Sequence, residues 1–243
     1  MADGAIAVTG SSRGIGASIA RELAARGFTV GCLSRGGGLP AGESDDARYI
    51  CATCDVTDEA SVRKALKFVA KEAGGLHGLV NNAGVHREAR SHSLTSDDFD
   101  DMMVTNARSV MMVSREAHPH LKGVDGARIV NIGSFFDKLG VPKNLAYCAS
   151  KAAVGAITRC LAAEWARDGI TVVNVAPGYI ETDLNREALT DARFQDWIGS
   201  RSPARRAGTA DEVARLVASL FSDNIPFMTG ETIYLDGGQS MAI

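Results

Sequence analysis

Several features that mark specialised classes of protein are missing from this sequence. Its 26 Lys and Arg residues nearly balance 29 Asp and Glu residues, for a formal net charge of −3, so it has neither the basic surface of a nucleic-acid-binding protein nor an acidic tail. No apolar run approaches the roughly 18 residues that a membrane-spanning helix requires, and residues 1–4 lack the cationic segment of a secretory signal. We therefore expect a cytoplasmic protein with no nucleic-acid and no membrane partner.

Cysteine is also scarce, and no disulfide framework is expected. The five cysteines, an odd number, are spread through apolar segments and are interpreted as reduced residues of the core. Cys51 and Cys54 form a C-x-x-C pair in a strand-like run, without a second pair for zinc or a helix start that would acidify a thiolate. His118 and His120 lack a third ligand at a useful spacing. A solvated helix end is the preferred interpretation there, and no metal site is predicted.

Apolar content, by contrast, is sufficient for a substantial core. Hydrophobic residues make up 45% of the chain, and short β-rich apolar runs alternate with longer segments of helical period, which is typical of parallel βαβ winding. Strands are predicted at residues 5–9, 28–34, 48–51, 76–81, 127–133, 170–176 and 232–235. Helices are predicted at 15–25, 59–72, 99–118, 147–167 and 211–222, the third after capping residues 96–98 and the last with a capping box at 209–212. The pattern predicts an α/β fold whose parallel sheet is covered on both faces.

No repeat, low-complexity tract or linker divides the chain, so residues 1–243 are expected to form a single domain. One region, residues 181–207, breaks the alternation of strands and helices. It carries Phe194 and Trp197 among polar residues, followed by Pro203. We interpret it as a mobile helical lid over a substrate.

A glycine-rich turn directly follows the first predicted strand. It reads Thr9-Gly10-Ser11-Ser12-Arg13-Gly14-Ile15-Gly16 and leads into an amphipathic helix. Glycines let the backbone turn sharply and approach a ligand, and the free amides and positive dipole at a helix start attract phosphate. The spacing is G-x-x-x-G-x-G, but the strand–turn–helix context is that of a dinucleotide site. The expected ligand is a nucleotide diphosphate.

The end of the second predicted strand indicates which dinucleotide is bound. An acidic residue there selects NAD, whereas a basic residue pairs with the 2′-phosphate of NADP. This sequence has Ser34 and Arg35, with Arg13 in the glycine turn as a second cation and no acidic residue before Glu43. The sequence therefore favours NADP.

A group of polar residues further along the chain is suited to proton transfer. Tyr147 and Lys151 lie four positions apart at the start of a predicted helix, which places them on one face. A neighbouring ammonium and an oxidised nicotinamide ring would favour the phenolate and lower the phenol pKa from about 10. Ser134 follows the fifth predicted strand, where its hydroxyl would hold a substrate oxygen.

These motifs, in this order and at these intervals, resemble those of the short-chain dehydrogenase/reductase family over essentially the whole chain. The resemblance rests on residues 9–16, Asn81-Asn82-Ala83-Gly84, Asn106, Ser134, Tyr147-x-x-x-Lys151, Pro177-Gly178, Thr229-Gly230 and Asp236-Gly237-Gly238. It implies a Rossmann-type, doubly wound, seven-stranded parallel sheet in the order 3-2-1-4-5-6-7. The active site would then lie at the carboxyl ends of the strands.

The resemblance also implies a role for each matching residue. Tyr147 would protonate the carbonyl oxygen as hydride arrives, and Ser134 would hydrogen-bond that oxygen. Lys151 would bind the nicotinamide ribose and lower the pKa of Tyr147, and Asn106 would hold a water that links Lys151 to solvent. The cofactor contacts implied are, in the glycine turn, Gly10, Ser12, Arg13, Gly14, Ile15 and Gly16; beside the adenosine ribose, Ser34 and Arg35; and at the adenine, Asp55 and Val56. The others are Asn82, Ala83 and Gly84 near the ribose, Pro177, Gly178, Ile180 and Thr182 on the nicotinamide side, and Tyr147 with Lys151.

The reaction expected is NADPH-dependent reduction of a ketone or aldehyde carbonyl to an alcohol. A pocket lined by Phe135, Phe136, Leu145 and Tyr179, with Phe194 and Trp197 on the lid, would suit an apolar small-molecule substrate. The segment 177–183 resembles 3-oxoacyl-(acyl-carrier-protein) reductases, which is the alternative. Asp125 and Asp168 lie where that branch tends to carry arginines for an acidic carrier protein.

Two further expectations concern partners. A non-catalytic NADP-binding redox sensor is the alternative of another class, although a sensor has no need for an acid at Tyr147.

Family members commonly form tetramers through the helices predicted at 99–118 and 147–167 and through the last strand. The apolar residues Ala152, Ala153, Ala156 and Ile157 would permit such packing, so a homotetramer is expected.

Overall fold

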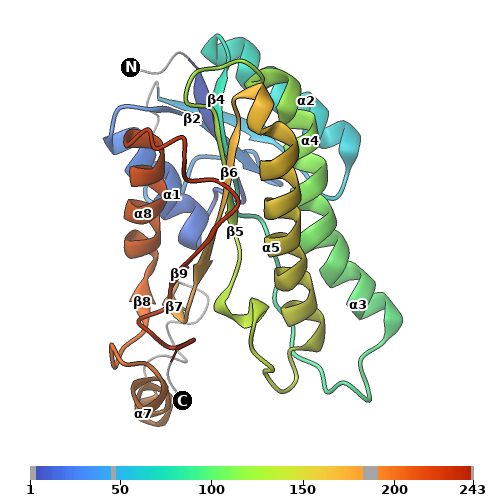
Figure 1. Ribbon diagram of the computed structural model, residues 1–243, viewed down its shortest axis with the longest axis vertical. Coiled ribbons are helices and arrows are strands. Elements are labelled where there is room, and N and C mark those ends of the chain that lie inside the picture. The colour runs from blue at the N-terminus through green and yellow to red at the C-terminus, as the bar shows by residue number, and fades with distance from the viewer. Residues whose placement is uncertain (1–3, 45–47, 183–190, 242–243) are drawn as a thin grey trace.

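The computed structural model describes residues 4–44, 48–182 and 191–241. Seven parallel strands form its central sheet in the order β3-β2-β1-β4-β5-β6-β9 (Figure 1). The strands are β1 Ala5–Thr9, β2 Thr29–Ser34, β3 Tyr49–Thr53, β4 Leu76–Asn81, β5 Arg128–Ile132, β6 Thr171–Pro177 and β9 Thr232–Leu235. All seven predicted strands are found, with ends that differ by no more than a few residues, and the expected order is confirmed.

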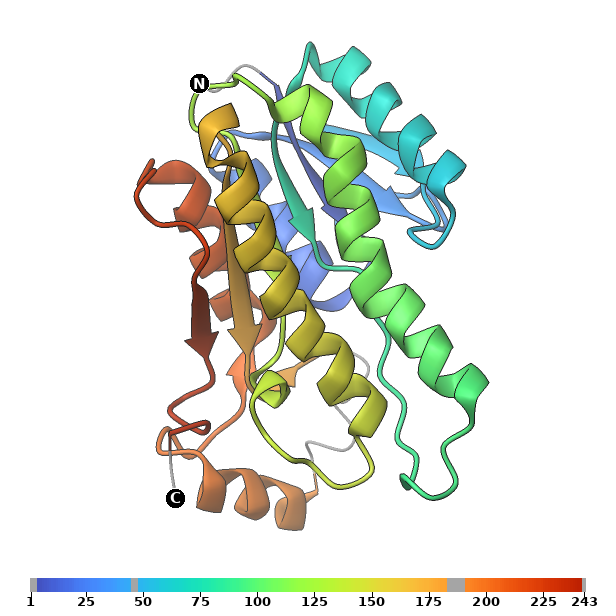
Figure 2. The same cartoon turned by 45° about the vertical axis from the view of Figure 1, so that its right-hand side comes forward.

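Helices cover both faces of the sheet (Figures 1 and 2). They are α1 Gly14–Ala25, α2 Glu59–Ala73, α3 Ser96–Met103, α4 Ser109–Leu121, α5 Leu145–Trp165, α7 Ala192–Arg201 and α8 Ala210–Ser222. Side chains alternate along β1: Ala5 and Ala7 join the cluster under α2, α4 and α5, whereas Ile6 and Val8 join the cluster under α1 and α8. Two apolar layers thus hold one sheet between them, as the doubly wound fold requires.

The helix expected at 99–118 differs from the prediction in a way that affects the site. It begins at Ser96, because Thr95 is the cap: the Thr95 hydroxyl accepts from the Asp98 amide at 3.1 Å. Residues 96–98 therefore form the first turn and do not precede it. A π-helical turn, Val104–Arg108, joins α3 to α4, and α4 continues past Pro119 to Leu121.

The last helix begins as predicted. At the start of α8, Thr209 accepts from the backbone amide of Glu212, and the Glu212 carboxylate accepts from the Thr209 amide. This capping box is confirmed. It directly follows β8, Gly208–Thr209, which pairs with β7, Ile180–Glu181, to form a separate two-stranded sheet.

Two expectations for cysteine and histidine are confirmed only in part. Cys32 and Cys54 are buried, but Cys160 is exposed on α5, so the five free cysteines are not all core residues. His118 is not merely solvated: its Nε2 lies 2.8 Å from a carboxylate oxygen of Asp168, and its ring lies against Trp165. Asp168 also binds Lys122, and these contacts fasten the end of α4 to the end of α5.

None of the helices in the described part of the chain is both long and apolar enough to cross a membrane. Over the same residues, no group of three or more His, Cys, Asp or Glu side chains is arranged to hold a metal ion.

Candidate active site

The glycine turn lies where the chain leaves β1 for α1, at the carboxyl edge of the sheet. Gly10 and Gly14 adopt φ values of 66° and 56°, which favour glycine. At Gly16 a Cβ would lie 2.2 Å from the Gly10 carbonyl oxygen, so no side chain fits there. Arg13, the residue before α1, provides no side-chain cap. The backbone amides at the start of α1 therefore have no side-chain acceptor at this cap and are suited to an anion.

Hydrogen bonds connect the glycine turn to the segment after β4. Thr9 Oγ1 accepts from the amides of Asn82 and Ala83 at 3.0 and 3.1 Å. The Asn82 side chain donates to the carbonyls of Thr9 and Gly10 at 3.0 and 3.2 Å. Two predicted cofactor segments, which are about 70 residues apart in sequence, thus form one wall at the crevice where the strand order reverses between β1 and β4.

The predicted adenine end of the site lies after β2 and β3. Ser34 is buried, and its hydroxyl accepts from the Gly37 amide, whereas Arg35 is exposed. Asp55 accepts from both the amide and the hydroxyl of Thr57, and these hydrogen bonds lower the pKa of Asp55, with a further contribution from Arg35. Ser12 and Arg13 are exposed and Ile15 is half-buried in the turn, while Val56 is buried.

The predicted nicotinamide end is formed by the residues that follow β6. Gly178 has no room for a side chain, because a Cβ there would lie 2.7 Å from the Cα of Asp236. Ile180 is buried in β7. The Thr182 methyl group lies 3.8 Å from the point where a Gly14 Cβ would be. The residue that follows β7 therefore lies beside the glycine turn.

The four predicted catalytic residues meet beside this crevice. Lys151 is buried in α5, and its Nζ donates to the Ile132 carbonyl at 2.8 Å. A Cβ at Gly84 would lie 3.1 Å from Asn106 Oδ1 and 3.7 Å from Lys151 Nζ, so Gly84 leaves room for both. Lys151 Nζ also lies 5.7 Å from the centre of the Tyr147 ring.

The π-helical turn places Asn106. Its side chain donates to the Val85 carbonyl and accepts from the Val85 amide, both at 2.8 Å, and donates to the Ser150 hydroxyl at 3.1 Å. The Ser150 hydroxyl in turn donates to the Tyr147 carbonyl at 2.8 Å. Asn106 therefore joins the helix of Tyr147 to the segment after β4.

Burial determines the protonation of the two central groups. It lowers the pKa of Lys151 to about 8 and raises the pKa of Tyr147, while a hydrogen bond with Ser134 opposes the increase. For the protein alone, removal of the phenolate from water is the larger effect, and the lowering of the Tyr147 pKa by an oxidised nicotinamide stays a prediction. Ser134 also accepts from the Phe136 amide at 3.3 Å. It therefore both caps a turn and contacts the phenol.

Aromatic side chains extend away from the phenol. The rings of Phe136 and Tyr147 are 5.8 Å apart, Phe135 and Tyr179 are 5.3 Å apart, and Tyr179 lies 5.4 Å from Trp197 on α7. This line of rings agrees with the predicted pocket lining, except that Leu145 is 48% exposed. The side chain of Phe194 lies outside the described part of the structure.

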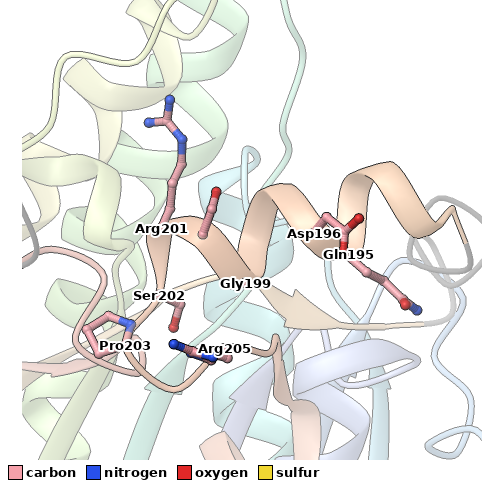
Figure 3. A pocket seen from close by; sticks show the side chains of 8 residues that line it. Gln195, Asp196, Gly199, Arg201, Ser202, Pro203 and Arg205 are labelled. Carbon is pink, nitrogen blue, oxygen red and sulfur yellow. The ribbon is translucent and has the colours of Figure 1, made fainter.

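A hollow separate from the crevice lies at the carboxyl end of α7 (Figure 3). It has a volume of about 730 Å³ and is lined by Gln195, Asp196, Gly199, Ser200, Arg201, Ser202, Pro203 and Arg205. The side chains of Arg201 and Arg205 point in different directions, and the Arg201 guanidinium lies 5.0 Å from the centre of the Trp197 ring. The hollow contains none of the predicted catalytic residues, so we do not assign the chemistry to it.

Two residues at the site were missed by the sequence reasoning. His86 packs its ring against Tyr147, with 4.7 Å between ring centres, and Asn144 lies 2.5 Å from the His86 Nε2. The position of His86 two residues after the Asn-Asn-Ala-Gly motif was the available signal. It did not reveal a contact with a loop almost 60 residues away.

Comparison with known proteins finds similarity over nearly the whole chain. A family model described as enoyl-(acyl carrier protein) reductase matches residues 10–240. Gluconate 5-dehydrogenase of Gluconobacter oxydans is 32% identical over 241 residues, 97% of this chain and 94% of that protein. The 3-oxoacyl-(acyl-carrier-protein) reductase of Haemophilus influenzae is 38% identical over 235 residues, 95% of this chain and 96% of that protein. A short-chain dehydrogenase/reductase structure from Serratia marcescens superposes with a TM-score of 0.85 at 32% identity, covering 98% of both chains.

Proposed function

Because the chain belongs to the short-chain dehydrogenase/reductase family and is an oxidoreductase, we propose that it reduces a ketone or aldehyde of a small molecule to an alcohol with NADPH. The observation that carries the proposal is the meeting of Tyr147, Ser134 and Lys151. Lys151 lies close to Gly84, in the segment after β4 that is hydrogen-bonded to the glycine turn. A phenol whose pKa is raised keeps its proton at neutral pH. It can therefore donate a proton in carbonyl reduction, and the ammonium of Lys151 would stabilise the phenolate that remains.

Each residue has a role that follows from its position. When bound, the nicotinamide supplies the hydride. Ser134 holds the substrate oxygen, and the Tyr147 hydroxyl gives its proton to that oxygen as the alcohol forms. Lys151, in its charged form, binds the nicotinamide ribose and stabilises the phenolate that Tyr147 becomes when it gives up its proton. Asn106 holds the segment after β4 against α5, which fixes the position of the phenol relative to the predicted cofactor site.

The cofactor residues fit a dinucleotide phosphate. Gly16 provides space that a Cβ would fill, and the amides that begin α1 suit a diphosphate. Arg35 and Arg13 are exposed at the expected adenosine end and would pair with a 2′-phosphate. Arg35→Asp is expected to weaken NADPH binding far more than NADH binding, because it replaces the attraction with repulsion. Equal losses in fluorescence titrations with the two cofactors would remove the assignment of NADP.

Tyr147→Phe tests the reaction itself. It removes the transferable proton but little volume, so turnover should fall by at least ~10²-fold while NADPH binding persists. NADPH oxidation is measured with 3-oxoacyl thioesters, oxo-sugar acids, quinones and simple ketones. Turnover near that of the wild type in the variant contradicts the proposal. Tight NADPH binding by the wild type without turnover of any carbonyl favours the redox sensor.

A second candidate, 3-oxoacyl-(acyl-carrier-protein) reduction, is favoured by the relatives that bear this name at 38% identity. Asp168 counts against it, because that branch tends to carry an arginine for an acidic carrier at about this position, whereas here a carboxylate pairs with Lys122 and His118. Comparison of a carrier-bound substrate with a short thioester of the same acyl group separates the two reactions. A strong preference for the carrier-bound form supports the second candidate.

Cytoplasmic location and a homotetramer complete the proposal. On α5, Ala152 and Ala156 are exposed, while Ala153 and Ile157 are half-buried. Small exposed residues allow two helices to approach closely, which is compatible with an interface along α5.

A further inference from the structure

Two loops that flank Tyr147 are fastened to each other. One follows β4 and carries His86, and the other precedes α5 and carries Asn144. His86 Nε2 lies 2.5 Å from Asn144 Oδ1, and the Ala89 amide donates to the Lys143 carbonyl at 2.9 Å. These two connections join the segment that begins with the predicted cofactor wall to the residues immediately before the helix that bears the phenol.

The chemistry of Asn144 defines the state of His86. Asn144 is 4% exposed, and its Nδ2 donates to the Pro142 carbonyl at 3.0 Å, which leaves Oδ1 facing the imidazole. An amide oxygen only accepts, so the Nε2 of His86 must carry the proton and donate. The partner thereby fixes both the tautomer and the orientation of the imidazole.

The backbone beside Asn144 adopts a conformation that costs energy. Lys143 has a φ of 66°, in the left-handed region that residues other than glycine rarely occupy. Such a conformation persists where surrounding contacts determine it, and it occurs frequently at functional sites. Here the contacts from His86 and Ala89 hold the loop in place, so the start of α5 depends on the segment after β4.

The imidazole also contacts the phenol directly. The His86 and Tyr147 rings meet edge to face, with an interplanar angle of 68°. Phe136 contacts the Tyr147 ring in a second edge-to-face arrangement, with an angle of 84°. Rotation of the phenol about its side-chain bonds therefore meets a neighbouring ring at two contacts. Its hydroxyl is held near Ser134, which contributes to its pKa, and the centre of its ring lies 5.7 Å from the ammonium of Lys151.

We propose that His86 is a positioning residue for Tyr147. Fastened by Asn144, it keeps the phenol in the orientation in which the hydroxyl meets Ser134 and the substrate oxygen. The proposal rests on the proposed function, because it assumes that Tyr147 is the proton donor. Since small displacements of a catalytic group reduce rates strongly, His86 would act on turnover without touching the reacting atoms.

Three substitutions separate the two contacts of His86. His86→Ala removes both and is expected to lower kcat about tenfold or more, with KM changed by less than about twofold. His86→Phe keeps a ring against Tyr147 and should retain more turnover than His86→Ala. His86→Gln keeps a donor for Asn144 but loses the ring. Because Asn144→Ala removes the other half of the hydrogen bond, adding it to His86→Phe should cause little further loss.

A second measurement distinguishes positioning from general damage to the fold. The titratable side chains that face the phenol are Lys151 and Cys148 on α5 and His86 from the loop. If the phenol is displaced in His86→Ala, both its burial and its hydrogen bond with Ser134 change, so its pKa and the pH dependence of alcohol oxidation should shift. The same shift should appear in the absorbance titration of tyrosinate, corrected with Tyr147→Phe. This readout does not require turnover.

The control is His92→Ala, because His92 is an exposed histidine in the same loop. It should leave kcat and the pH profile unchanged. The proposal is overturned if His86→Ala retains wild-type kcat and pH dependence, or if His86 and Asn144 show no coupling in a double-mutant cycle of thermal unfolding. The unfolding cycle remains informative if the wild type reduces no carbonyl, so failure of the proposed function can be told apart from failure of the inference.

Discussion

Lys151 is a buried cation, and its burial has consequences that can be measured. Burial lowers its pKa to about 8, while Tyr147 keeps its proton to higher pH because its own pKa is raised. We therefore expect kcat/KM for carbonyl reduction to fall as pH rises through about 8, where the free enzyme loses the ammonium. Lys151→Arg, which stays charged, should lack this decrease. A decrease at the same pH in both proteins would contradict the assignment.

The lowered pKa of Lys151 also affects stability. Between pH about 8 and 10.5, the unfolded chain binds a proton at this lysine that the folded protein does not. Stability relative to Lys151→Met should therefore rise with pH across this window, by ~3 kcal/mol in all. Denaturant unfolding of the two proteins at several pH values measures the difference. A constant difference would mean that Lys151 titrates normally in the folded state.

Residues that lie within a motif could be predicted from the sequence, whereas those that act through a contact between loops could not. Tyr147 and Lys151 are recognised because helical spacing places them together. His86 and Asn144 are 58 positions apart, and no local pattern predicts that two loops meet. The burial of Tyr147, which raises its pKa in the protein alone, depends on packing and could not be predicted from neighbouring residues.

At the scale of elements, α7 carries Trp197, the last of the aromatic rings that extend away from Tyr147. Trp197 lies edge to face with Tyr179 and is 38% exposed, so it meets both the pocket lining and solvent. Trp197→Ala should raise KM for a substrate with an apolar body about tenfold, because the loss of an aromatic contact costs ~1–2 kcal/mol. Its kcat should change little, since the phenol is several rings away. Phe68→Ala, an exposed aromatic residue on α2, is the control, and an equal rise in KM there would argue against a role for α7.

Elements were predicted more reliably than their ends. Strands β1, β4 and β9 have the expected limits because turn residues border them. The helix expected at 99–118 began too late in the prediction, since Ser96, Asp97 and Asp98 are all capping residue types and only the structure identifies Thr95 as the cap. The π-helical turn that places Asn106 has no signature in the residue types Val104–Arg108.

For the whole molecule, the sheet depends on close contact between β4 and α8. A Cβ at Gly78 would lie 2.4 Å from the Phe221 ring and 3.1 Å from the Arg128 carbonyl oxygen. Gly78→Ala should therefore destabilise the fold by ~1–3 kcal/mol through overpacking, with kcat retained by the folded fraction. Gly155→Ala on α5 is the matched control. Its Cβ would meet only a flexible Arg159 side chain, and it should stabilise by ~0.5–1 kcal/mol. Denaturant unfolding measures both, and equal effects would contradict the prediction.

The pairing of β7 with β8 has a consequence for how specificity can change. Ile180 pairs with Gly208 and Glu181 pairs with Thr209, so the stretch of chain between them leaves and returns at neighbouring points. An insert anchored in this way can be exchanged for one of different length or composition while the sheet below stays intact. Transplanting residues 183–207 from a relative with another substrate would then transfer substrate preference, and it would leave the proton donor and the predicted cofactor contacts of the recipient, Thr182 included, in place.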